Sequence, residues 1–135
     1  MANPNKQIRG AIVQGLKILT GLEVYENSIP LDDDLPNQYI VISSQGKRKT
    51  NASKGCFDFM VSVTLNLISV NEKGYNSGLS NDDLEVNVFN FLESFKAVGV
   101  HINDRDFINT LSTVIEMPDH TINQTNIVYE IWTAN

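Results

Sequence analysis

Residues 57–67 read FDFMVSVTLNL, and this stretch decides the fold. Apolar side chains occupy every odd position, and mostly polar side chains occupy the even positions between them. A period of two predicts a β-strand with one buried face. Such a strand is typical of an antiparallel sheet that is covered by other elements on one side.

Two helical patterns flank this strand in the sequence. In residues 5–19 the apolar side chains at helical spacing are Ile8, Ala11, Ile12, Leu16 and Leu19. In residues 80–95 they are Leu84, Val88, Phe91, Leu92 and Phe95, and Ser80 is the expected N-cap. We therefore expect two amphipathic helices, the first of which ends at Thr20-Gly21.

The remaining patterns predict four more strands, at residues 22–25, 39–43, 107–117 and 121–133. A crossover bounded by Pro30 and Pro36 follows the first of them, a long hairpin loop is expected at residues 45–55, and Pro118-Asp119 is the expected turn between the last two. The predicted fold class is α+β, in the order α-β-β-β-α-β-β. It has one antiparallel β-sheet, a long β-hairpin, two helices packed on one face and the terminal strand at an edge.

Length and composition are those of a single folded domain spanning residues 1–135. The net charge of −6 argues against nonspecific binding of nucleic acid by the whole surface, although DNA could still pass through an acidic ring. Cys56 is the only cysteine, so the chain forms no internal disulfide. We expect no signal peptide, no membrane segment and folding in a cytoplasm.

Residue types that carry chemistry are sparse and scattered. His101 and His120 have no partner at metal-ligand spacing, and the consecutive side chains of Asp32, Asp33 and Asp34 cannot all converge on one cation. Phosphate-loop, nucleophile-elbow and zinc-protease motifs are missing from the sequence. We therefore expect no catalytic residues, no metal site, no cofactor and no enzymatic activity.

Basic residues are concentrated in the expected hairpin loop, at Lys47, Arg48, Lys49 and Lys54. Two interpretations stay open for this cluster. It is either a solvated loop tip, or a partner-docking loop that binds an acidic neighbour or DNA phosphates. Near the C-terminus, Tyr129 and Trp132 are candidates for the core or for an interface, since aromatic side chains are enriched in both settings.

Residues 21–41, GLEVYENSIPLDDDLPNQYIV, give a more specific signal. A short strand, a proline-bounded crossover and an Asn-Gln-Tyr start to the second strand occur in this order, after one helix and before a long hairpin. This arrangement resembles that of bacteriophage tail terminator proteins, which are also called tail-completion or head-tail joining proteins. Asp32-Asp33-Asp34 lengthens the crossover relative to that family, and the role of this insertion stays open.

The resemblance implies a structural virion protein, assembled in the host cytoplasm, that forms a hexameric ring in the neck. Its implied partners are other copies of itself, the tail tube protein and the head-tail connector or stopper protein, and DNA would pass through the ring without sequence-specific binding. Two alternatives stay open. One is a different neck ring subunit, such as a head-completion, adaptor or stopper protein, and the other is a small α+β ligand-binding domain.

Overall fold

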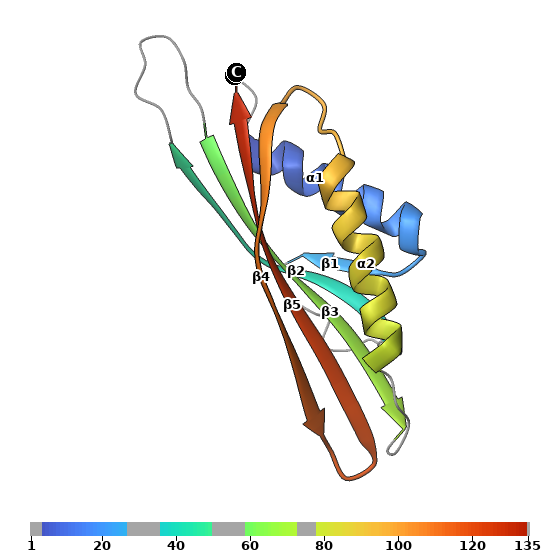
Figure 1. Ribbon diagram of the computed structural model, residues 1–135. Helices are drawn as coiled ribbons and strands as arrows, with labels where there is room; N and C mark the ends of the chain where they lie inside the picture. Colours follow the sequence, from blue (N-terminus) through green and yellow to red (C-terminus); the bar gives the residue numbers. More distant parts are fainter. Residues whose placement is uncertain (1–3, 27–35, 50–58, 73–77, 135) are drawn as a thin grey trace.

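The computed structural model describes residues 4–26, 36–49, 59–72 and 78–134 (Figure 1). The elements in chain order are α1 (Pro4–Thr20), β1 (Val24–Glu26), β2 (Gln38–Lys49), β3 (Phe59–Glu72), α2 (Gly78–Ser94), β4 (His101–Glu116) and β5 (His120–Ala134). The order predicted from the sequence is therefore confirmed. The first helix ends as expected, because Gly21 adopts a left-handed φ of 69° and its amide donates to the Lys17 carbonyl.

The five strands form one sheet in the order β1-β2-β3-β5-β4. Three of the four strand pairs are antiparallel, and only β1 runs parallel to β2. The sheet is thus mostly antiparallel rather than wholly so, since the segment between Glu26 and Gln38 is long enough to return the chain to the same end. The terminal strand β5 lies between β3 and β4, which corrects its expected place at an edge.

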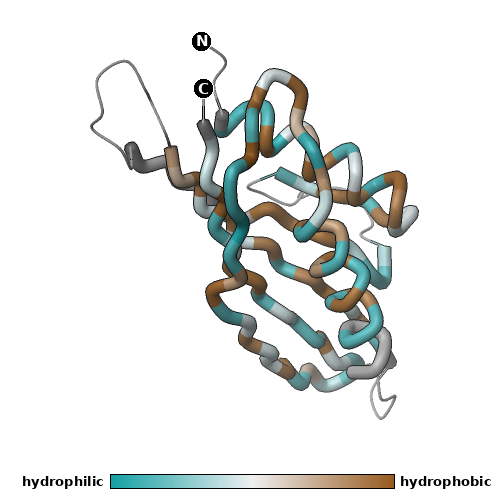
Figure 2. Tube along the Cα trace, turned by 45° about the horizontal axis from the view of Figure 1, so that its top comes forward, coloured by the Kyte–Doolittle hydropathy of each residue, from teal (hydrophilic) through white to brown (hydrophobic). Residues whose placement is uncertain are grey.

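Both helices cover the same face of the sheet and enclose one hydrophobic core (Figure 1). The alternation predicted for residues 57–67 is confirmed, because Val61, Val63, Leu65 and Leu67 are all buried in this core. Side chains of β2, β5 and both helices complete it, including Ile42, Ile131, Ile12 and Leu92. Figure 2 shows the resulting alternation of hydrophobic and hydrophilic residues along the central strands.

The two helices are in contact at Gly15 of α1, which has no side chain. A Cβ atom added at Gly15 would collide with the ring of Phe91 on α2, which itself stacks on Phe95 with a centroid distance of 5.4 Å. Gly15 lowers the intrinsic helix propensity of α1. The position is nevertheless explained by packing, because only glycine lets the Phe91 ring approach the α1 backbone this closely.

Several elements are longer than their hydrophobic patterns indicate. β2 runs to Lys49 and β4 begins at His101, in stretches that are polar and carry no clear alternation. These polar stretches are strands because their backbones pair with β3 and β5. Helix α2 begins at Gly78, so Ser80 lies inside the helix rather than at its N-cap.

Candidate interaction surface

The longest strand, β4, forms one edge of the sheet and is the most exposed element of the chain. Every residue from 108 to 117 is exposed, and the large apolar side chains among them are Ile108, Leu111, Val114, Ile115 and Met117. Glu116 is the only charged residue in that stretch, and it contains no proline. Natural edge strands usually carry charges, prolines or covering elements that prevent pairing with another chain. The distal half of β4 has little of this protection.

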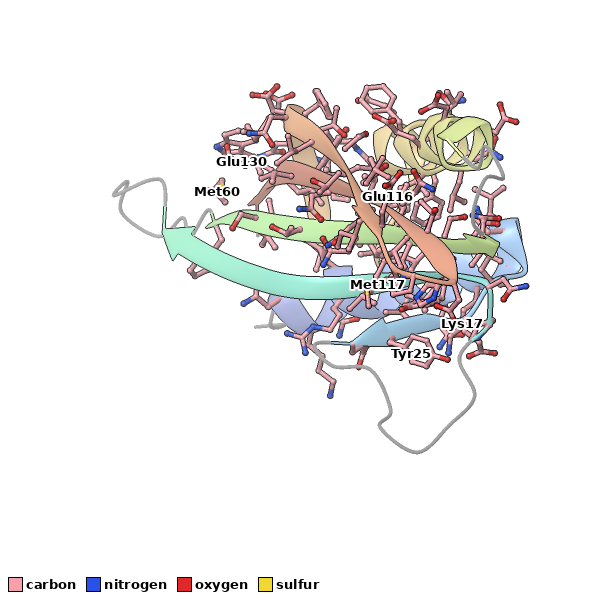
Figure 3. All side chains as sticks on the ribbon, turned by 90° about the horizontal axis from the view of Figure 1, so that it is seen from below. Lys17, Tyr25, Met60, Glu116, Met117 and Glu130 are labelled. Atoms are coloured by element: carbon pink, nitrogen blue, oxygen red, sulfur yellow. The ribbon has the colours of Figure 1, made fainter. Side chains whose placement is uncertain are left out.

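Figure 3 views the molecule from below and shows where this edge lies. Glu116 and Met117 are labelled at the tip of the β4–β5 hairpin, well away from Met60 and Glu130. The hairpin turn is the predicted one, since Pro118 and Asp119 lie between the two strands and the Met117 amide donates to the His120 carbonyl at 2.9 Å. The apolar positions of β4 therefore extend along an open edge toward a projecting tip.

The proximal half of β4 is held against α2 by Arg105. Its guanidinium donates to the Leu92 carbonyl at 2.8 Å and to the Phe95 carbonyl, and it lies 4.9 Å from the centroid of the Phe95 ring. These carbonyls belong to the end of α2, where helix carbonyls lack partners within the helix and attract positive charge. Arg105 thus fixes the start of β4 while its charge is directed toward the helix.

Tyr129 is fully buried in the core, which agrees with the first of its two interpretations from the sequence. Its hydroxyl donates to the Glu93 carboxylate at 2.7 Å, and its ring meets Phe89 edge-on. Burial, together with the Glu93 carboxylate, raises the pKa of the Tyr129 hydroxyl above its ordinary value. Trp132 is half-buried, in the same transverse row of the sheet as Met60 and Asp104, so it retains exposed surface.

The basic cluster lies only partly in a loop. Lys47, Arg48 and Lys49 belong to β2 and pair with Val61, Met60 and Phe59 of β3, so the expected loop 45–55 begins later than predicted. Lys54 lies outside the described residues, as do Cys56 and the run Asp32-Asp33-Asp34. The three basic residues of β2 are therefore presented by a strand, and their role in docking stays a prediction.

The histidines occupy separate places. His101 is exposed at the start of β4, whereas His120 opens β5 and contacts Asp119 with 2.6 Å between its Nδ1 and the carboxylate. The hydrogen bond from His120 lowers the pKa of the Asp119 carboxyl group below its ordinary value. Among the described residues, no group of three or more His, Cys, Asp or Glu side chains is placed to hold a metal ion.

A surface hollow of about 360 Å³ lies beside the start of β4 and is lined by Lys96, Ala97, Val100, His101, Ile102 and Arg105. Its titratable side chains are two cations and a histidine, without a carboxylate beside them. No helix in the described part of the chain is both long and apolar enough to cross a membrane.

Sequence reasoning missed two features of this surface. The exposed apolar residues of β4 were included in a predicted strand, but only the sheet order shows that this strand is an edge. The second feature is the open side of β2 beyond Ile42, where β1 has already ended. The shortness of the apolar run at residues 22–25 was the one sequence signal that could have indicated it.

Comparison with known proteins identifies the fold but no family. No protein-family model matches the chain, and no curated protein matches it by sequence. Among solved structures, a chain in one described as the virion of a native gene transfer agent (GTA) particle has a similar fold, with a TM-score of 0.74 and 12% sequence identity. The similarity covers 99% of this chain and 100% of that chain. The fold of this chain is thus shared, end to end, with a chain of a virion.

Proposed function

We propose that this chain is a structural virion protein whose copies form a ring at the end of a tail tube. In this role it terminates tube polymerisation and joins the tail to the head connector. The ring is hexameric, in keeping with the resemblance of residues 21–41 to tail terminator proteins. Its copies bind and assemble, without catalysis or a cofactor.

The observation that carries the proposal is the end-to-end similarity to a GTA virion chain. A shared fold does not by itself fix function, because one fold can carry many different sites. The fold similarity and the resemblance in element order support the same class of particle. The near-complete coverage of both chains also favours a subunit of similar size and outline.

The surface supports an assembling protein for a physical reason. A ring requires two different surfaces on each copy that fit one another, so that the last copy closes on the first. The sheet has two dissimilar edges, the long exposed β4 and the partly covered β2. Exposed apolar residues such as Leu111 and Val114 on β4 are typical of a surface that another protein covers.

Tail assembly with and without the chain tests the proposal. Particles made without it are expected to have tubes of irregular length and no attached heads, and adding the purified protein is expected to restore joining. Electron microscopy of restored particles should show the chain as one ring between tube and connector. Normal tails joined to heads in its absence would contradict the proposal.

The same images separate the remaining candidate. A head-completion, adaptor or stopper subunit would be found on the head side of the neck, and tubes formed without it would keep their normal length. A terminator contacts the last tube ring and limits tube length.

A further inference from the structure

At each edge of the sheet, a stretch of strand has no neighbouring strand among the described residues. The two stretches lie at the same position along the strands. β4 pairs with β5 on one side only, since it is last in the sheet order. At the other edge, β1 pairs with Ile40, Val41 and Ile42 alone. The next part of β2, residues 44–49, has β3 on one side and no strand of the described residues on the other.

The strand registers place these two open stretches in the same transverse rows. One row runs through Arg48, Met60, Trp132 and Asp104, and another through Gly46, Ser62, Glu130 and Asp106. The open part of β2 is therefore level with the proximal half of β4. In Figure 1 the upper end of β2 lies to the left of β3 and β5, and the upper end of β4 lies to their right.

Strand direction also suits pairing between copies. The steps from β2 to β3, from β3 to β5 and from β5 to β4 are all antiparallel, so β2 and β4 run in opposite directions. If a second copy lies beside the first in the same orientation, its β2 is antiparallel to β4 of the first. No shift along the strands is needed to bring the matching rows together.

The charges on the two edges are complementary. The open part of β2 carries Lys47, Arg48 and Lys49, without an acidic residue. In the matching part of β4, the exposed Asp104 shares its row with Arg48, and the exposed Asp106 lies two residues further along on the same face. Lys47 shares its row with Arg105, whose guanidinium is bound to the end of α2. Pairing two β2 edges, or two β4 edges, would instead set like charges opposite one another, which is unfavourable.

β2 and β4 each have a register shift next to the same transverse row. This row limits how far the two edges can pair between copies. The irregularity in β2 lies between Ile42 and Ser44, and one in β4 lies between Phe107 and Asn109. Ser44 and Asn109 share a row through Thr64 and Val128. Below this row β1 already covers β2, so only the proximal half of β4 can pair with the neighbouring copy.

We propose that a second copy of this chain docks by adding residues 44–49 of its β2, antiparallel, to residues 102–107 of β4, with Arg48 opposite Asp104 and diagonal to Asp106. The contact is head to tail, so it repeats from copy to copy and can close into the ring of the proposed function, on which this inference rests. One such short strand pair is weak, and closure of the ring multiplies it.

A charge exchange tests the pairing. The first variant carries Arg48→Glu, and the second carries Asp104→Lys. Each variant places like charges on both edges, so its self-association, measured by analytical ultracentrifugation, is expected to be weaker than wild type by about tenfold or more. A mixture of the two variants restores opposite charges at every contact, and native mass spectrometry should find rings in which they alternate.

The matched control carries Lys17→Glu on α1, which changes the net charge by the same amount as the first variant. It is expected to associate like wild type, and circular dichroism should show that all variants fold. Association of both edge variants at wild-type strength, failure of the mixture to assemble, or a wild type that is monomeric at every concentration would each overturn the pairing. These outcomes concern self-association of the purified protein. The test of the proposed function instead measures tail length and head joining in particles, so the two can fail separately.

Discussion

β3 and β4 border the same strand, yet their environments differ. Both pair antiparallel with nearly the whole of β5, one on each side. In β3, alternate residues are buried under the helices, and Leu65 has no exposed surface. In β4, all residues from 108 to 117 are exposed, and Leu111 retains 62% of its surface.

The difference arises from neighbours rather than from backbone pairing. β3 has a strand on each side and helices over one face, whereas β4 has one strand neighbour and contacts α2 only in its proximal half, through Arg105 and Phe107. Apolar side chains in β3 therefore stabilise the fold, and those in residues 108–117 of β4 are free to stabilise contacts with another molecule. Mutations should separate the two strands, with large effects on folding in one and small effects in the other.

The largest expected effect is that of Leu65→Ala in β3. Removing a fully buried leucine leaves a cavity and should lower the free energy of unfolding by about 2–5 kcal/mol. Leu111→Ala in β4 should change it by less than about 0.5 kcal/mol, because that side chain is largely exposed. Urea unfolding at low protein concentration measures both. If Leu111→Ala lowered the free energy of unfolding as much as Leu65→Ala, the proposed difference between β3 and β4 would be wrong.

Arg105→Met tests the hydrogen-bonded attachment of β4 to α2, beside which Phe107 of β4 packs edge-on against Phe89. The variant loses two charge-assisted hydrogen bonds to helix carbonyls, so the free energy of unfolding should fall by about 1.5–3 kcal/mol. Amide exchange should also accelerate in β4 more than in β3. The neighbouring change Asp104→Asn serves as the control, and an equal loss there would show that the Arg105 contacts contribute little.

Gly15→Ala and Gly10→Ala form a matched pair on α1, in the covered part of the molecule. The first should cost about 1–3 kcal/mol, because the added methyl group overpacks against the Phe91 ring. The second should stabilise by up to about 1 kcal/mol, since the Gly10 site is open and alanine favours the helix. Thermal unfolding measures the pair, and gains of equal size at both sites would contradict the close contact between helices.

Tyr129→Phe should lower the free energy of unfolding by about 1 kcal/mol at neutral pH, because the hydrogen bond to the exposed Glu93 disappears. The pH dependence sharpens this prediction. The pKa of Tyr129 is raised in the folded state, so the unfolded chain loses its proton first as the pH rises above about 10. The free energy of unfolding of the wild type should therefore fall above that pH. Denaturant titrations should show a shallower fall in the variant, and an unchanged slope would contradict the raised pKa.

Those parts of the fold that bury apolar side chains were predictable from the sequence. The alternation around Val61 and Val63 and the helical stripe containing Ile8, Ile12 and Leu16 each report burial in the core. Periodicity cannot report a strand that is held by backbone pairing alone. The stretch from Gln45 to Lys49 pairs with β3, but it is polar and was therefore predicted as part of a loop. The start of β4 was missed for the same reason.

Sheet order was the other unpredictable property, and the candidate surface depends on it. The chain order gives no physical reason for β5 to enter between β3 and β4, so the sequence suggested a terminal edge strand. For the same reason, the basic residues of β2 and the acidic residues of β4 appeared unrelated. Their common rows emerge only from the registers through β3 and β5.

The central place of β5 has a consequence for folding. β5 follows every other described element in the chain, yet it supplies one whole flank of β3, and the contact between Thr133 and Phe59 spans 74 residues. Closing so long a loop is entropically costly and slows folding. Until β5 arrives, β3 offers a long, β-prone flank to other unfinished chains. During synthesis, the interval before β5 emerges is therefore when this protein is most exposed to aggregation and most dependent on chaperones.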